Sequence, residues 1–143
     1  MARTLTSTNS EFILSVSGLY AGVKIEGFAS DDAFTFDAFE TGVGMMGVDG
    51  KFSMGYVPSP KPQNITLQAD SDSIDVFEAI YAYIVSQRET IRLSGVVTVQ
   101  STGKSYALSD GVLVNYTPVP DHKRTLQPQR FTIMWGSVMP AKI

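Results

Sequence analysis

The chain has 143 residues, a formal net charge of −3 and no cysteine. This length fits one domain, residues 1–143, with a core of its own. The lack of cysteine excludes disulfides, cysteine-ligated iron–sulfur clusters and cysteine-based zinc sites, and the chain has no basic excess for tight binding to nucleic-acid phosphates. Charged residues make up 17% of the chain, below the usual ~25%. A surface this poor in charge is typical of subunit contacts.

The N-terminal segment predicts neither export nor membrane insertion. The first twelve residues, MARTLTSTNSEF, lack the apolar core of a secretory signal. No apolar run approaches the ~18 residues of a membrane span. We therefore expect a protein made and kept in the cytoplasm, unless an assembly carries it elsewhere. Residues 1–10 are polar and rich in Thr and Ser, which predicts a flexible N-terminal arm.

Alternation of apolar and polar residues predicts that most of the chain forms half-buried β-strands. The strands expected in the first half lie at 12–17, 23–28, 34–40 and 64–68, with a loop at 30–32 and a proline-rich linker at 58–62. Those expected in the C-terminal third lie at 91–100, 105–108, 112–117 and 131–135, with turns at 101–104 and 109–111 and a loop at 118–128.

Residues 71–89 carry the one convincing helical period. Apolar residues recur at steps of three and four and form a single stripe: Ile74, Phe77, Ile80, Tyr81, Ile84 and Val85. Ser71 or Asp72 is expected to cap the helix. About eight strands and one helix predict a mainly β fold, an antiparallel β-barrel or sandwich with one flanking α-helix.

The segment Gly42–Tyr56, GVGMMGVDGKFSMGY, predicts a projecting hairpin over residues 42–57. Asp49-Gly50 is typical of a tight turn with positive φ at both positions. The glycines weaken both strands, yet the apolar side chains between them still need cover. A projecting hairpin has little of its own body to cover them, so we expect contact with a neighbouring chain. The residues expected in this contact are Val43, Met45, Met46, Val48, Asp49, Lys51, Phe52 and Met54.

No motif in the chain supports catalysis or the binding of a metal or cofactor. Gly50-Lys51 lacks both the first glycine and the following hydroxyl of a phosphate-binding loop. Asp70-Ser71-Asp72 departs from a calcium loop at its fifth and sixth positions, and the single histidine, His122, cannot easily build a zinc site. We therefore expect a protein that is not an enzyme and has no cofactor.

A series of short motifs resembles the tail tube proteins of contractile-tailed (myovirus-type) bacteriophages. The resemblance runs from about residue 10 to about residue 140, and the order and spacing of the motifs carry it. The motifs are GVDGK at 47–51, LQADS at 67–71, VF at 76–77, STGKSY at 101–106, TLQP at 125–128 and FTIMW at 131–135.

The resemblance implies a structural virion protein. In that family six copies join their sheets edge to edge into a ring, and rings stack into a hollow tube that conducts double-stranded DNA without sequence-specific binding. A long hairpin and the N-terminal arm make the contacts between rings. The implied partners are further copies of the chain, the tail sheath, the baseplate hub and the tape-measure protein. The implied location is the virion tail, assembled in the host cytoplasm.

Two alternatives stay open beside the tube subunit. One is a related structural piece, either a tube terminator or a subunit of a secretion tube of the same fold. The other belongs to a different class, a small monomeric β-barrel with a ligand cleft under the helix. For a tube, a polar and weakly negative wall would let DNA pass, because a strongly positive bore would hold the phosphates. The residues expected to line the bore are Glu26, Asp37, Thr98 and Gln100.

Overall fold

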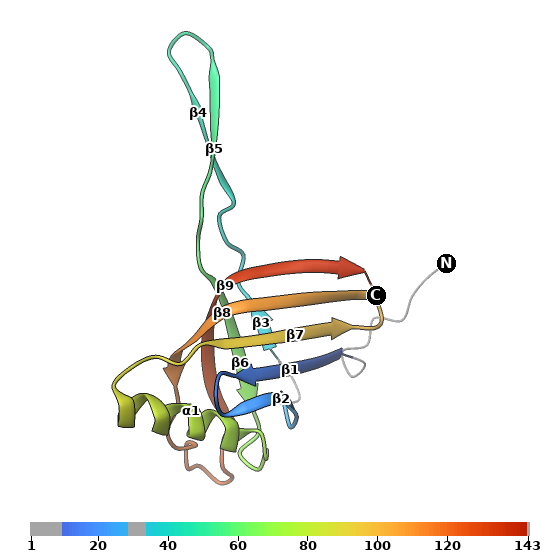
Figure 1. Cartoon of the computed structure of the whole chain (residues 1–143), viewed down its shortest axis with the longest axis vertical. Helices are drawn as coiled ribbons and strands as arrows, with labels where there is room; N and C mark the ends of the chain where they lie inside the picture. Colours follow the sequence, from blue (N-terminus) through green and yellow to red (C-terminus); the bar gives the residue numbers. More distant parts are fainter. Residues whose placement is uncertain (1–9, 29–33, 143) are drawn as a thin grey trace.

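A computed structural model describes residues 10–28 and 34–142, and most of these residues lie in β-strands (Figure 1). The predicted N-terminal arm, apart from Ser10, and the predicted loop at 30–32 lie outside the described residues. The strands are β1 Ser10–Val16, β2 Tyr20–Lys24, β3 Phe34–Phe36, β4 Gly42–Met46, β5 Phe52–Tyr56, β6 Lys61–Leu67, β7 Leu93–Val99, β8 Lys104–Tyr116 and β9 Gln129–Lys142. The helix α1 spans Ile74–Gln87.

Seven strands form one antiparallel sheet in the order β2-β1-β7-β8-β9-β6-β3. This sheet curls until the segment that follows β2 meets β6. Phe28, just after β2, forms an antiparallel bridge with Leu67 of β6, and the ring of Phe34 in β3 lies 5.7 Å from that of Phe12 in β1. The predicted mainly β fold with one flanking helix is therefore confirmed.

The helix packs against one end of the curled sheet and closes the core there (Figure 1). Phe77 stacks on Phe131 of β9 with ring centroids 4.3 Å apart. Tyr81 stacks on Tyr116 of β8 at 4.6 Å, and burial, followed by the charge of Glu78, raises the pKa of Tyr116. Of the predicted stripe, Ile74, Phe77 and Ile80 are buried and Ile84 is partly buried against the core, whereas Tyr81 and Val85 are exposed.

The prediction that Ser71 or Asp72 caps the helix is wrong. The cap position is Ser73, which makes no capping hydrogen bond with its side chain. Both nearby serines instead hold the segment after β2, since the Glu26 amide donates to Ser73 Oγ at 2.8 Å and Ser71 Oγ donates to the Glu26 carbonyl. The helix therefore begins later than the acidic and hydroxyl residues predict.

Several predicted strand boundaries are also wrong. The strands expected at 23–28 and 34–40 lie instead at Tyr20–Lys24 and Phe34–Phe36. Pro62, predicted to lie in a linker, is part of β6 and pairs with Met134. Its carbonyl accepts from the Asp37 amide, just beyond the edge strand β3. Because β3 ends before this position, the amide hydrogen that proline lacks is not needed by a neighbouring strand. The turn predicted at 109–111 is a bulge within the continuous strand β8. Asp110 there takes a φ of 55°, and Gly111 leaves room for the indole of Trp135.

Phe77→Ala should lower the free energy of unfolding by about 3–5 kcal/mol, because it removes a stacked ring and leaves a cavity. Phe77 is fully buried. Chemical denaturation measures the change, and Val85→Ala, on the exposed half of the helix, is the matched control, with an expected change of about 0.5 kcal/mol or less. An equal loss of stability in both variants would contradict the assigned core.

Candidate assembly surface

The strands β4 and β5 form a separate two-stranded sheet that projects from the end of the molecule opposite to α1 (Figure 1). Opposed residues of an antiparallel pair share a face, and the register pairs Gly42 with Tyr56, Gly44 with Met54 and Met46 with Phe52. We call this side, with its four large apolar side chains, the assembly face. The other side carries Val43 and Met45.

The large residues of the hairpin are all exposed, including those on the assembly face. Met54 is 79% and Tyr56 is 81% exposed. A shallow groove of about 510 Å³ on the hairpin is lined by Gly42, Val43, Gly44, Phe52, Met54, Gly55 and Tyr56. A Cβ atom at Gly44 would lie only 2.4 Å from the ring of Phe52, so the glycine lets this ring lie across the neighbouring strand. An exposed apolar surface of this kind is typical of one that a second chain covers.

The turn at the tip differs from the predicted one. The sequence predicts positive φ at both Asp49 and Gly50, whereas only Gly50 has it, at 85°. The Gly47 amide donates to the Lys51 carbonyl at 2.7 Å and the Gly50 amide to the Gly47 carbonyl at 3.0 Å. These are the bonds of a three-residue loop that ends in a glycine bulge. The loop leaves the Val48 side chain entirely in solvent.

Side-chain contacts attach the stem of the hairpin to the body. Ser59 Oγ donates to the Glu40 carbonyl at 2.8 Å and joins the two sides of the stem to each other. Lys61 Nζ of β6 lies 5.0 Å from the centre of the Phe39 ring and links the stem to the body. The side-chain amide of Asn64 donates to the Asp37 carboxylate at 3.4 Å. The base of the hairpin is therefore held in place, while its apolar part extends beyond the sheet.

A second exposed feature is an open edge of the large sheet. β9 is flanked by β6 on one side and β8 on the other. β6 pairs with β9 only up to Trp135, whereas β8 pairs with β9 along both halves, as far as Lys142. Within the described residues, Gly136–Lys142 therefore has a strand partner on one side only. Pro140 lies in this segment, as is typical of an edge strand.

The face of the sheet turned away from the core carries a row of serines beside an apolar row, in which Ile13 pairs with Val96, Val96 with Ala107 and Ala107 with Met139. Ser15 pairs with Ser94, and Ser109 pairs with Ser137. Because Ser94 lies opposite the bulge that contains Ser109, the four serines cross β1, β7, β8 and β9 in one row. We call this surface the serine face.

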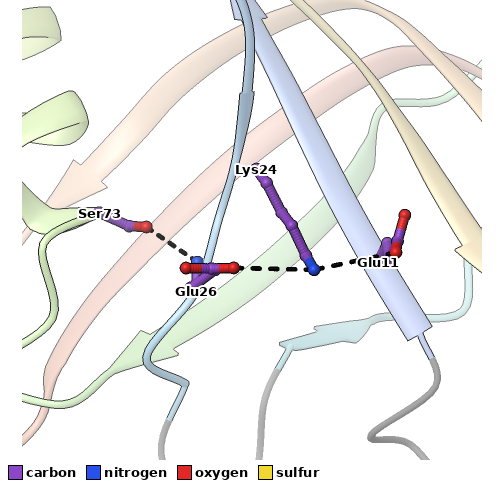
Figure 2. A network of polar contacts seen from close by, with 4 residues as sticks. All are labelled: Glu11, Lys24, Glu26 and Ser73. Carbon is purple, nitrogen blue, oxygen red and sulfur yellow. Dashed lines mark hydrogen bonds and ion pairs between the residues drawn. The ribbon is translucent and has the colours of Figure 1, made fainter.

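The structure brings some of the expected bore residues together and separates one. Thr98 lies on the serine face opposite Glu11, with Gln100 just beyond it. Lys24 Nζ joins Glu11 at 3.8 Å to Glu26 at 3.6 Å (Figure 2). Asp37 lies apart from this group, at the stem of the hairpin next to Asn64. The contribution of Glu11 was missed because strand register cannot be inferred from one strand alone.

The described residues offer no site for metal chemistry. None of their His, Asp and Glu residues form a group of three that could hold an ion. His122 is exposed in the loop at 117–128, where it forms a short bridge with Leu126. Over the same residues, no helix has the length and apolar character needed to cross a membrane.

Fold and surface together define a β-rich structural subunit with an apolar projection and an open sheet edge. The family model of tail fiber protein gp32 matches residues 3–139, and the chain belongs to this family. It is thus a structural protein of a phage tail or a tail-like particle, which agrees with the predicted resemblance at the level of tail proteins. No curated protein matches the chain.

Solved structures with the same fold come from contractile injection systems. A chain of the anti-feeding prophage baseplate matches with a TM-score of 0.63 at 8% identity, over 99% of this chain and 98% of the other. A chain of the anti-feeding prophage tube-terminating cap matches with a TM-score of 0.60 at 14% identity, over 100% of this chain and 94% of the other. A chain from the sheath–tube complex of an extracellular contractile injection system matches with a TM-score of 0.55 at 16% identity, over 92% of this chain and 88% of the other. At these identities the matches establish the fold alone.

Proposed function

We propose that the chain is a tube-type subunit of a contractile tail, with six copies forming a ring and rings stacking into a conduit for DNA. The single observation that carries this proposal is the exposed apolar hairpin at one end of a folded body with an open sheet edge. The number six comes from the resemblance to tail tube proteins. The tail sheath, the baseplate hub and the tape-measure protein are the further partners in this proposal.

In the proposed ring, the open edge at Gly136–Lys142 pairs with the β2 edge of the next copy. Unpaired strand edges are an aggregation hazard, and closed ring symmetry satisfies them. The sheet order supports this arrangement, because β1, β7, β8 and the second half of β9 run side by side between these two edges.

In the proposed tube, the serine face lines the bore. Its serine row and the apolar row beside it carry no charge, and the Glu11, Lys24 and Glu26 group adds one net negative charge per copy. Such a wall repels phosphates weakly, over a range that salt limits to about 8–10 Å. Thr98, Gln100 and Glu26 keep their proposed place at the bore, and Asp37 belongs instead near the contact between rings.

Particle size and shape test this proposal. Purified protein at high concentration should show ring-shaped particles with six-fold symmetry, or tubes, by negative-stain electron microscopy, with matching masses by analytical ultracentrifugation. A ligand-binding β-barrel would stay monomeric. A strictly monomeric species at every concentration would overturn the proposal.

A tube terminator is the second candidate function. Chains of a tube-terminating cap and of a sheath–tube complex both share this fold, with TM-scores of 0.60 and 0.55, so the fold does not separate the two roles. A terminator would form single rings that do not stack on one another, so the length of the particles distinguishes the two roles.

A further inference from the structure

We propose that the hairpin tip of one copy seats in a hollow at the opposite end of a second copy, beside α1. This inference deepens the proposed function, on which it rests, by naming the surface that receives the hairpin. The tip comprises Val48–Lys51. The receiving hollow, of about 530 Å³, is lined by Gln68, Ala69, Asp70, Thr125, Leu126 and Pro128.

The tip and the hollow lie at opposite ends of the molecule. The hairpin projects from one end, while α1 and the loop at 117–128 form the other (Figure 1). From Thr41 to the tip the strand extends about 23 Å, so the tip cannot reach the hollow of its own chain. Two complementary surfaces at opposite ends produce a head-to-tail contact, which repeats from copy to copy without closing.

The chemistry of the tip indicates an apolar socket with flanking charges. Val48 is fully exposed at the outermost position, where a polar residue would be expected of a tip that stays in water. Between Thr41 and Pro60 the only charged residues are Asp49 and Lys51. A partner surface that offers apolar contact for Val48 and one charge of each sign complements this tip.

The hollow supplies this combination. Leu126 is 51% exposed at its edge, and Asp70 lies in its lining. A neighbouring hollow of about 710 Å³ shares Pro128 and carries Lys123 and Arg130 together with Asp121. None of these charged groups forms an ion pair within the described residues, where the pairs involve other side chains. With Val48 seated against Leu126, the pairs of opposite charge that the lining offers are Lys51 with Asp70 and Asp49 with Lys123 or Arg130.

Engineered cysteines test the contact directly, because the chain has no cysteine of its own. The double variant Val48→Cys with Leu126→Cys should, under oxidising conditions at assembling concentration, give a ladder of dimers, trimers and longer species on a non-reducing gel. Each single-cysteine variant should stop at dimers. The double variant Val48→Cys with Val96→Cys, whose second cysteine lies on the serine face, is the matched control and should give no ladder.

The outcomes separate this inference from the proposed function. Wild-type protein that forms tubes, with a Val48–Leu126 variant that cross-links no more than the control, would overturn the inference and leave the proposed function intact. Wild-type protein that never assembles would overturn both. All altered positions are exposed, and an unchanged unfolding midpoint confirms that the variants fold.

Charge reversal tests the pairing of Lys51 with Asp70. Lys51→Glu and Asp70→Lys should each raise the protein concentration needed for assembly at least tenfold. A mixture of the two variants should assemble nearly as well as the wild type, because every contact between the two kinds of chain then joins opposite charges. Equal assembly by the wild type and both single variants would overturn this pairing.

Discussion

Removal of the hairpin should abolish stacking of the rings and leave the body folded. The change replaces residues 43–55 by Asn-Gly, which joins the paired residues Gly42 and Tyr56 through a two-residue turn. The removed strands belong to the separate sheet, so the core loses no partner. Electron microscopy should show single rings and no tubes.

Chemical denaturation provides the control for this variant. Its unfolding midpoint should stay close to that of the wild type, or rise slightly, because an isolated two-stranded hairpin is at best marginally stable in water. Normal tube growth by the shortened chain would mean that another element stacks the rings. A large loss of stability would mean that the hairpin packs on the body.

The two faces of the hairpin should differ strongly in their effect on assembly. The triple variant Met46→Gln, Phe52→Gln and Met54→Gln keeps the strands and makes the assembly face polar. Burial of each such side chain in the contact between copies contributes about 1.5–3 kcal/mol to the free energy of association. The three substitutions together therefore remove about 4.5 kcal/mol or more. Since 1.4 kcal/mol corresponds to a factor of ten, the concentration needed for assembly should rise about a thousandfold.

The matched control alters the opposite face of the same hairpin. Val43→Thr with Met45→Gln removes less apolar surface and leaves the assembly face intact. We expect the concentration needed for assembly to rise no more than about tenfold, which corresponds to 1.4 kcal/mol. Sedimentation of assembled particles over a concentration series measures both variants. An equal effect of the two sets would show that the hairpin is buried on both sides.

Local sequence patterns were sufficient for the fold class because each strand buries alternate residues against one core. Phe12, Leu14 and Val16 are all buried, as their alternation predicts. The same patterns failed where long-range contacts decide. Asp110-Gly111 has the composition of a turn, yet the indole of Trp135 packs over this glycine and the strand continues through it.

The candidate surface was only partly predictable for the same reason. Composition alone predicted the apolar hairpin, since its glycines weaken the strands and its methionines and other apolar side chains need cover. The serine face and the open edge of β9 depend on which strands are neighbours and in which register. Ser15, Ser94, Ser109 and Ser137 are far apart in the sequence, and no local pattern predicts that they form one row.

A cryo-electron microscopy structure of the assembled particle tests the central claim most directly. The account predicts rings of six copies in which the edge at Gly136–Lys142 pairs with β2 of the next copy, the serine face lines the bore and the hairpin contacts the adjacent ring. A solid fibre with intertwined hairpins and no bore would contradict the account. So would a bore lined mainly by lysine and arginine.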